Sequence, residues 1–383
     1  MKFSIIAPLL AGGALAAPTT DSNSNSHPSA AGAVFAMTNV ASANQIVAFS
    51  RSSSGELTPA GTYATGGRGQ GVDFDTQGGL QLSADRKFLY AVNPADDKVS
   101  VFGVHGANLT LIQTVYAGDQ PLGIALSPKT GYAYVLDGSV ASTGIFGFKV
   151  DGGDGKLQPL TNATIPLSTP IGVPGDVVFS PDGRALVVTN KVGSTLDVFA
   201  VDAASGHASP TPMTTIASSG VRPFAAAFFK DFLYVIESGL PSLKNAALST
   251  YRFNGGAAPS LTAITKAERN DQTDGCWVVV TPDGKWAYTA NFVSGSISSY
   301  GLDGNGTATL MNGAAALPGG EGSQPVDLVL SSDGRYLYNL LRGSGAVAGY
   351  EIQQDGSLKQ IGGLVGKGMG LPAMDGASGL AGY

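Results

Sequence analysis

Short apolar runs recur along this chain in a fixed order, and that order predicts β-strands. In each unit one run ends at a polar residue, and roughly ten positions later a second run ends at an aromatic. The polar ends are Asn39, Asn93, Asp137, Asn190, Glu237 and Asn291, with Leu341 as the seventh; the aromatic ends are Phe49, Phe102, Phe148, Phe199, Tyr251, Tyr300 and Tyr350. Successive ends lie 44 to 54 residues apart. A strand repeat of about fifty residues predicts an all-β, seven-bladed propeller.

The second unit shows what one blade should contain. β-Branched and aromatic residues fill the segments 79–83, 88–93, 99–102 and 109–115, and Gly, Pro, Asp and Asn separate these segments. Alternation of strand formers and turn formers is typical of consecutive antiparallel strands. Each blade is therefore predicted to be a four-stranded antiparallel sheet.

A polar turn between the first and second strands recurs in the later units and is missing from the first. In three units it ends in Asp-Gly, and the fifth unit has a shorter version, Lys230-Asp231. The first unit begins directly at its second strand, residues 33–38. Because an unpaired inner edge would be sticky and unstable, we expect the apolar C-terminus, residues 376–383, to insert there and close the ring.

Antiparallel pairing decides which loops share a face of the propeller. Loops that follow the second and fourth strands lie on one face, called here the loop face. The first-to-second turns lie on the other, called the turn face. We expect a binding site on the loop face near the axis. The sequence leaves open whether the Gly-rich segment 66–75 plugs it.

The N-terminus has the pattern of a secretory signal. Lys2 supplies a positive charge, residues 3–15 are apolar, and residues 14–16 form a small-x-small cleavage site. We assign residues 1–16 to a signal peptide, 17–32 to a disordered lead-in, and 33–383 to one propeller domain. No other segment is long and apolar enough to cross a bilayer, so we expect a soluble, secreted, extracellular protein without a membrane partner.

Composition and glycosylation motifs further limit the class of protein to which this chain can belong. Cys276 is the only cysteine, so an internal disulfide is excluded. The net charge of −6 offers no basic face for nucleic acid. Acceptor sequons begin at Asn108, Asn162 and Asn305. Asn108 and Asn305 fall in third-to-fourth turns, so glycans there would lie on the turn face and leave the loop face open.

Six of the seven second-strand ends carry Asn, Asp or Glu, and we expect them to ring the axis on the loop face. An Asn in such a place can bond the backbone of the next turn, so each also has a purely structural interpretation. Glu237 differs, because its longer side chain is a poor turn former. Asn93, Asn190 and Asn291 are candidate substrate-binding residues, and Glu237 is a candidate acid or base.

Charged residues also lie where the first strands begin: Asp119, Asp176, Arg222, Asp274 and Asp327. Arg222 precedes Pro223 and should point a permanently charged guanidinium toward the axis. One Arg among carboxylates suits a small acidic ligand. Arg68 lies in a Gly-rich run that either cradles an anion or is a flexible loop. Trp277 either stacks on a ring-shaped ligand or packs between blades.

Several other chemistries are not supported by the sequence. His27, His105 and His207 fall in the lead-in, a turn and a loop, so neither a His-based catalytic set nor a metal site is predicted. The chain has no Gly-x-Ser-x-Gly elbow and no His-Glu-x-x-His motif. Proton transfer would fall to carboxylates, without a cofactor.

The repeats resemble those of the lactonase-type seven-bladed propellers. The resemblance is carried by residues 80–93, Leu-Gln-Leu-Ser-Ala-Asp-Arg-Lys-Phe-Leu-Tyr-Ala-Val-Asn, and by 278–300 and 326–338, and it covers about residues 32–383. That family includes one bacterial type of 6-phosphogluconolactonase and the fungal carboxymuconate lactonizing enzymes. The chain most resembles secreted fungal cyclase-like surface glycoproteins. The resemblance implies a cofactor-free site for a sugar-acid or muconate lactone.

The chain matches the family's functional pattern only in part. The strand ends Asn93, Asn190 and Asn291 match its Tyr-x-x-Asn pattern. The resemblance also implies a His, Glu and Arg set with His and Arg where first strands begin, but the corresponding pairs here are Gly175-Asp176, Phe224-Ala225, Trp277-Val278 and Val326-Asp327. Secretion argues against a cytosolic sugar-phosphate substrate.

Two functions fit these features. In the first, a monomeric secreted lactone hydrolase or cyclase-like isomerase acts on a small carboxylated lactone; Glu237 or Asp327 moves the proton and Arg222 holds the carboxylate. The residues expected to contact substrate are Asn93, Asn190, Asn291, Trp277, Asp176 and Arg68. In the second, a non-catalytic glycoprotein binds a partner, the cell wall or the matrix. The polar ring and Arg222 favour the enzyme; a quinone- or metal-dependent oxidoreductase would lack ligands.

Overall fold

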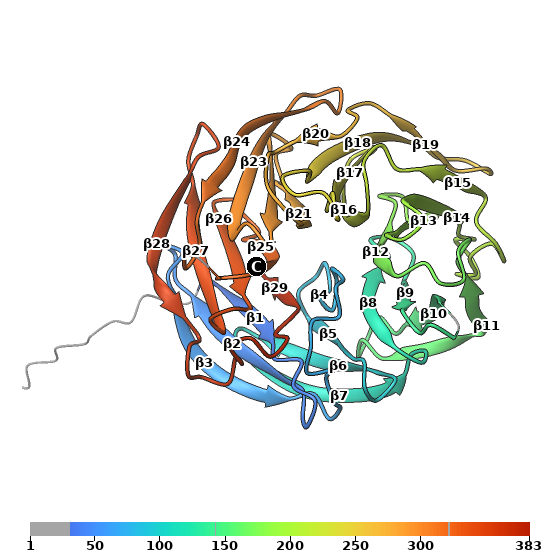
Figure 1. The fold of residues 1–383 in the computed structure, drawn as a ribbon. Coiled ribbons are helices and arrows are strands. Elements are labelled where there is room, and N and C mark those ends of the chain that lie inside the picture. Colours follow the sequence, from blue (N-terminus) through green and yellow to red (C-terminus); the bar gives the residue numbers. More distant parts are fainter. Residues whose placement is uncertain (1–30, 142, 321) are drawn as a thin grey trace, which may run out of the picture.

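The computed structural model describes residues 31–141, 143–320 and 322–383. Within them seven β-sheets follow one another around a ring, so that the red C-terminal blade lies beside the blue N-terminal one (Figure 1). Neighbouring strands within the blades pair antiparallel. The predicted seven-bladed propeller is therefore confirmed. Residues 1–30, which include the expected signal peptide, lie outside the described residues.

The blades are numbered in chain order, each from its innermost strand outward. Blade 1 contains β29 (Leu380–Gly382), β1 (Gly32–Met37), β2 (Gln45–Arg51) and β3 (Leu57–Ala64). Blade 2 contains β4 (Leu80–Leu82), β5 (Phe88–Asn93), β6 (Lys98–His105) and β7 (Asn108–Tyr116). Blade 3 contains β8 (Pro121–Leu126), β9 (Tyr132–Asp137), β10 (Gly144–Val150) and β11 (Leu157–Pro166). Blade 4 contains β12 (Pro174–Phe179), β13 (Ala185–Asn190), β14 (Thr195–Ala200) and β15 (Thr214–Ala217).

The last three blades complete the ring. Blade 5 contains β16 (Pro223–Phe229), β17 (Phe232–Glu237), β18 (Ala247–Asn254) and β19 (Ser260–Ala263), and a short β20 (Glu268–Arg269) also pairs with β18. Blade 6 contains β21 (Gly275–Val280), β22 (Trp286–Asn291), β23 (Ser296–Leu302) and β24 (Ala308–Ala316). Blade 7 contains β25 (Pro325–Leu330), β26 (Tyr336–Leu341), β27 (Ala346–Ile352) and β28 (Leu358–Val365).

The C-terminus closes the ring, as the sequence predicted. β29 pairs antiparallel with β1, with Phe35 opposite Ala381. Beside this short ladder, Met37 N donates to Gly379 O at 2.9 Å and Tyr383 N donates to Ala33 O at 2.9 Å. Blade 1 thus takes its innermost strand from the far end of the chain, and no inner edge of β1 is left exposed.

A second interaction, repeated between blades, fastens the ring from within. A tyrosine in a second strand donates its hydroxyl to a glycine carbonyl in the third-to-fourth turn of the next blade. The pairs are Tyr90 and Gly155, Tyr134 and Gly206, Tyr288 and Gly356, and Tyr338 and Gly55, at 2.7 to 2.9 Å. The last pair joins blade 7 to blade 1. These hydroxyls are buried under apolar strands, and burial raises the pKa of all four tyrosines.

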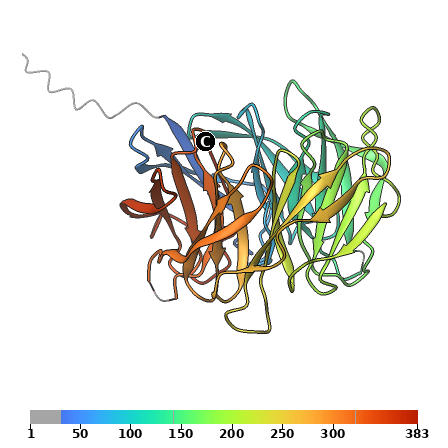
Figure 2. The same ribbon diagram turned by 90° about the horizontal axis from the view of Figure 1, so that it is seen from above.

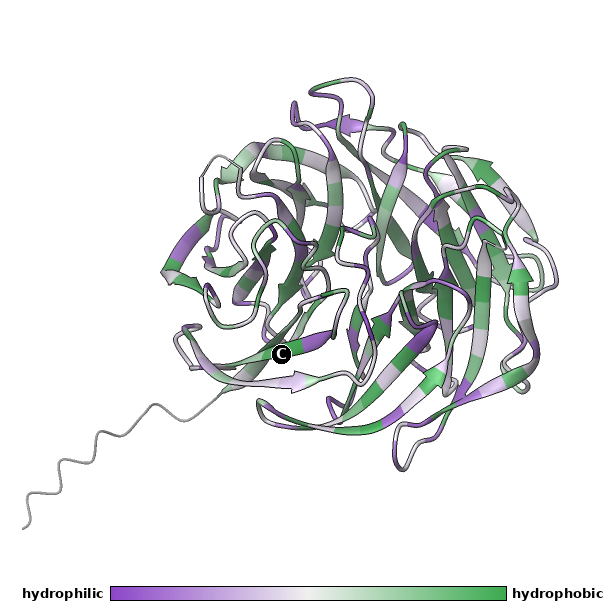
Figure 3. Ribbon diagram, turned by 60° about the horizontal axis from the view of Figure 1, so that its bottom comes forward, coloured by the Kyte–Doolittle hydropathy of each residue, from purple (hydrophilic) through white to green (hydrophobic). Residues whose placement is uncertain are grey.

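The two faces of the propeller are separated by the length of the strands, as the side view shows (Figure 2). Apolar residues run along the packed strands, and hydrophilic ones are more frequent in the connecting loops (Figure 3). In the described part of the chain no helix has the length and hydropathy needed to span a bilayer.

One loop of the ring runs across the axis. We call residues 72–78, in the connection from β3 to β4, the crossing segment. Thr76 Oγ1 donates to Leu122 O of blade 3 at 2.9 Å, Gln77 N donates to Gly175 O of blade 4 at 3.1 Å, and Gln77 Oε1 accepts from Val278 N of blade 6 at 3.1 Å. Gln77 bonds blades 4 and 6 from a loop that leads into blade 2, so the connection that follows the Gly-rich segment 66–75 spans the axis.

We expect the closing strand to carry a large share of the stability. A chain ending at Asp375 loses β29 and exposes the edge of β1, and burial of Leu380 alone is worth about 1.5–3 kcal/mol. The unfolding free energy in guanidinium chloride should fall by about 3 kcal/mol or more, with aggregation of the folded remainder. Tyr383→Ala, which keeps β29, should cost far less. Equal stability of the truncated and full chains would contradict this role.

Candidate functional site

The second-strand ends do not ring the axis as expected; their side chains are buried between strands and loops. Asn93 Nδ2 donates to Ser100 Oγ at 2.8 Å, while its Oδ1 accepts from Thr65 Oγ1 at 2.6 Å. Asn291 is likewise bonded to Ser298 Oγ at 2.8 Å. Asn190 is fully buried, and both atoms of its amide are without a protein partner among the described residues. None of the three side chains is exposed to a ligand on the loop face in this conformation.

Glu237 is also enclosed rather than open to a ligand. Its Oε1 accepts from Ser218 Oγ at 2.8 Å and from Gly220 N at 3.1 Å. A Cβ added at Gly220 would lie 2.8 Å from the Glu237 carboxyl carbon, so the loop rests directly on this carboxylate. Burial raises the pKa of Glu237 to about 7.

The residue that follows a second-strand end reaches other segments of the loop face in two blades. Both faces of a blade pack against neighbouring blades, so a strand-end side chain is buried, whereas the next residue already lies in a turn. Lys191, directly after Asn190, reaches the crossing segment. Arg342, directly after Leu341, donates to Gln324 Oε1 at 3.1 Å and lies over the Phe292 ring, 5.6 Å from its centroid.

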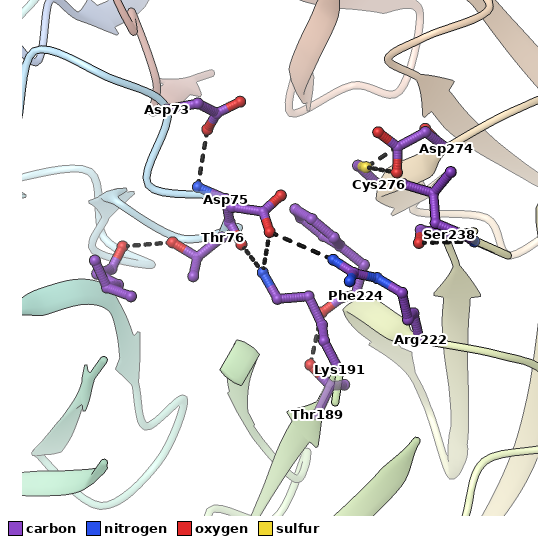
Figure 4. A network of polar contacts seen from close by, with 12 residues as sticks. Asp73, Asp75, Thr76, Thr189, Lys191, Arg222, Phe224, Ser238, Asp274 and Cys276 are labelled. Carbon is purple, nitrogen blue, oxygen red and sulfur yellow. Dashed lines mark hydrogen bonds and ion pairs between the residues drawn. The ribbon is translucent and has the colours of Figure 1, made fainter. Parts of the chain in front are cut away.

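Lys191, Arg222 and Asp75 form a charge cluster at the axial mouth of the loop face (Figure 4). Lys191 Nζ donates to Asp75 Oδ2 at 2.6 Å and also to Asp75 O. Arg222 Nη2 lies 3.8 Å from the same Oδ2. Lys191 Nζ also lies 4.5 Å from the centroid of the Phe224 ring. A carboxylate of the crossing segment thus occupies a site built by two cations of blades 4 and 5.

This cluster leaves donors free for a ligand. The Lys191 side chain is fully buried, but the Arg222 side chain is 33% exposed and that of Asp75 is 45% exposed. Arg222 Nε is buried and has no partner among the described residues, so the exposed third of the side chain must be its other atoms. The guanidinium can therefore bind an anion from the loop face while still contacting Asp75.

A strained turn aims Arg222 and Asp274 at the mouth. The residue just before the inner strand has a positive φ in four blades: Val173 (42°), Arg222 (58°), Asp274 (63°) and Gln324 (49°). Asp75 is also left-handed, with φ of 58°. Such conformations cost a non-glycine residue of order 1 kcal/mol and persist only where packing enforces them. In each of these four blades a register shift follows the turn at the start of the inner strand.

Two carboxyls and one thiol around the cluster have pKa values that burial raises. Burial raises the pKa of Asp73, whose Oδ1 accepts from Asp75 N at 2.8 Å. Burial also raises the pKa of Asp274, and the negative charge of Asp75 adds to the shift. Cys276 Sγ donates to Asp274 Oδ1 at 3.3 Å, and burial raises the pKa of this thiol well above its ordinary value.

The other sequence candidates lie apart from this cluster. The carboxylate of Asp176 accepts hydrogen bonds from two backbone groups, Val177 N at 2.8 Å and Ala226 N at 3.0 Å. Trp277 is fully buried and packs on Phe224 with 5.1 Å between centroids, so the packing interpretation is the one observed. Arg68 forms an exposed ion pair with Asp96 at 2.7 Å, on the rim.

The three expected catalytic residues are held by separate partners and do not share one cavity. Arg222 faces Asp75, and Glu237 lies under the Ser218–Gly220 loop. Asp327 Oδ2 accepts from Gly379 N at 2.7 Å, and burial raises its pKa to about 7. Among the described residues no group of three or more His, Cys, Asp or Glu side chains could hold a metal ion. Lys191 is the functional candidate that sequence reasoning missed; its signal was its position one residue beyond a strand end.

Comparison with known families identifies a match over much of the ring. The family described as "Lactonase, 7-bladed beta-propeller" matches residues 33–174 and 211–316. Among curated relatives, a 6-phosphogluconolactonase of Pectobacterium atrosepticum is 23% identical over 71% of this chain and 79% of its own length. A 6-phosphogluconolactonase of Cronobacter sakazakii is 23% identical over 71% of this chain and 93% of its own.

Solved structures confirm the architecture. A crystal structure from Bacteroides fragilis, provisionally named a 6-phosphogluconolactonase, superposes with a TM-score of 0.71, at 19% identity over 92% of this chain and 98% of its own. The periplasmic gluconolactonase of Pseudomonas aeruginosa superposes with a TM-score of 0.67, at 18% identity over 92% of this chain and 99% of its own. At these identities the likeness shows the fold.

The enclosure of Glu237 predicts a pH-dependent stability. The pKa of this carboxyl rises from its ordinary 4.5 to about 7 on folding, so between these values the folded chain binds more protons than the unfolded one. Stability therefore falls as the pH rises through this window. Glu237→Gln keeps an acceptor but does not titrate. The measurement is the unfolding free energy of each protein in guanidinium titrations at pH 4 and pH 8. The stability of the wild type relative to the variant should fall by about 3 kcal/mol between these pH values. The same difference at both pH values would contradict the enclosure of Glu237.

Proposed function

Since the chain belongs to the seven-bladed β-propeller lactonase family, we propose that it hydrolyses a small lactone bearing an anionic group at the axial mouth of the loop face. The family assignment bears out the expectation of a lactone hydrolase. The observation that carries the rest is the cluster of Lys191, Arg222 and Asp75, which brings two cations to a partly exposed site. Cations at such a mouth attract and orient a carboxylate or phosphate.

Hydrolysis of a lactone needs three things from this site. A base takes a proton from water as the water oxygen adds to the lactone carbonyl. Positive charge stabilises the oxyanion of the tetrahedral intermediate. The intermediate then breaks the ring C–O bond, and the protonated base returns the proton to the alkoxide, which gives a hydroxy acid. Arg222 and Lys191 supply the positive charge.

Asp274 is better placed as the base than the carboxylates inferred from the sequence. It lies half-buried in the turn before blade 6, its pKa is raised by burial, and the charges of Arg222 and Lys191 act on its carboxyl in the opposite direction. Glu237 lies behind the Ser218–Gly220 loop, and Asp327 binds Gly379 N. Glu237 and Asp327 stay candidates, and the variants below include them.

The substrate class follows from charge together with the family. The curated relatives are named 6-phosphogluconolactonases, whose name denotes a phosphorylated sugar lactone. The expected signal peptide favours a substrate outside the cytosol, so a sugar-acid lactone or muconate lactone with a carboxylate is our preferred choice. The alternative of a non-catalytic glycoprotein that binds the cell wall, the matrix or another partner predicts no turnover of any lactone.

Kinetics of matched variants test this proposal. We expect Arg222→Ala and Lys191→Met each to lower kcat/KM for an anionic lactone by about 10- to 100-fold, because the first removes an exposed charged donor and the second removes the buried charge that holds Asp75. Asp274→Asn should lower kcat by about 100-fold or more. Measurement is by pH-stat titration of glucono-δ-lactone, 6-phosphogluconolactone and muconolactone.

Controls separate the alternatives. Arg68→Ala, which removes an exposed guanidinium on the rim, should leave the kinetics unchanged. Glu237→Gln and Asp327→Asn should retain most of kcat; loss of turnover in either would return the proton transfer to that residue. Two results together would refute anion recognition at the mouth. These are equal rates for neutral and anionic lactones, and no change in either rate in the Arg222→Ala variant.

Secretion can be tested through the sequons. Asn108, Asn162 and Asn305 are all exposed on the outer part of the ring, so each can accept a glycan on the folded chain. We expect the secreted protein to lose mass on treatment with an N-glycosidase, and Asn-to-Gln changes at the three sites to remove that loss. Protein from culture medium that begins after Ala16 would support the signal peptide; retention in the cytosol without glycans would contradict it.

A further inference from the structure

The turn face has its own hollow, on the far side of the crossing segment from the charge cluster. This hollow has a volume of about 520 Å³ and is lined by the inner strands and first-to-second turns of blades 2 to 5. A smaller hollow of about 250 Å³ adjoins it along Gln81 and Leu82, and Gln77 and Gly78 of the crossing segment contribute to its wall. The axial channel is thus divided into a charged mouth and a separate hollow.

The walls of the larger hollow are apolar and held in place. Phe228 and Phe229 at the end of β16 are only partly buried. Phenylalanine side chains are ordinarily buried in full. Phe228 packs edge-on against Phe253 at 5.7 Å, and Phe179 packs against Tyr134 at 6.0 Å. A Cβ at Gly284 of blade 6 would lie 2.0 Å from the Phe229 ring, so that ring is held by the neighbouring turn. The hollow is a preformed apolar site of the size that small molecules occupy.

Blade 5 departs from the repeat at this hollow. Its turn is shortened to Lys230-Asp231, and Phe229 pairs directly with Phe232. By strand register its Phe228 takes the position of Val280 in blade 6. The shortened turn thus follows two aromatic side chains that line this side of the hollow.

Lys230 is the only charged residue in the lining. Lys230 is exposed at the rim, and its Nζ lies 5.2 Å from the centroid of the ring of the preceding residue, Phe229. It forms no ion pair in the part of the chain that the structure describes. Lys285, in the corresponding turn of blade 6, instead lies 3.4 Å from Asp283 Oδ2. One unpaired cation above an apolar hollow complements a molecule with a hydrocarbon body and a single anionic head.

We propose that the turn-face hollow is a second binding site, which takes an amphiphilic monoanion such as a medium-chain carboxylate. The apolar body enters between β4, β8, β12 and β16, and the anionic head lies at Lys230. This site is independent of the lactone chemistry, because the crossing segment separates it from Lys191 and Arg222.

Dye binding to the full chain tests the proposal. The probes are 1-anilinonaphthalene-8-sulfonate, which has an apolar body and one anionic group, and neutral N-phenyl-1-naphthylamine; dodecanoate is the competitor. We expect one saturable site for each dye and displacement of both by dodecanoate. Lys230→Glu should weaken the anionic dye by about fivefold or more and leave the neutral dye unchanged, as expected for loss of one exposed charge pair.

Matched variants decide where the dye binds. Lys285→Glu makes the same charge change on the next blade and should leave binding of both dyes unchanged, and Arg222→Ala should do the same. Leu126→Trp, which fills the hollow, should abolish binding of both dyes; if that variant does not fold, Lys230→Glu still decides. Absence of saturable binding, equal effects of Lys230→Glu and Lys285→Glu, or loss of binding in Arg222→Ala would overturn the proposal. So would a dimer in sedimentation experiments that excludes the dye.

Discussion

Pairing of β29 with β1 is the constraint on which the rest of this structure depends. Seven sheets in a row would leave an apolar face uncovered at each end, and each blade has too little core to stand alone. The C-terminal strand supplies the missing inner strand of blade 1, and the Tyr338 hydroxyl, bonded to Gly55 O, fastens the same seam from inside. With the seam closed, residues far apart in sequence meet on one axis.

The charge cluster is a consequence of that closure. Asp75 comes from the connection into blade 2, Lys191 from blade 4 and Arg222 from the turn before blade 5. Arg222, Asp274 and Asp75 all have left-handed backbone conformations, which a flexible loop would relax and a closed ring does not. Strain stored in the turns thus holds charged groups at the mouth, and partial burial strengthens their interactions with one another and with an anion.

The crossing segment gives the two ends of the channel different chemistry. On the loop face, cations and carboxyls of raised pKa surround a partly exposed guanidinium, which suits a small, charged and reactive ester. On the turn face, aromatic and aliphatic side chains surround a hollow whose lining has one charge, which suits a molecule held by its apolar surface. A single loop bonded to blades 3, 4 and 6 separates these environments, so one propeller can bind two unlike ligands.

The sequence by itself determined the number of blades, their strand order and the closing strand, because these follow from local periodicity and from the one blade that lacks an inner strand. It also placed Arg222 and Asp274 where inner strands begin. It misplaced Asn93, Asn190 and Glu237, because the pattern of apolar residues does not show whether the last side chain of a strand is enclosed by neighbouring strands and loops or is free at the loop face. Only the tertiary structure brought Asp75 to Lys191, 116 residues away, since a loop's path across the ring depends on bonds to blades that are distant in sequence.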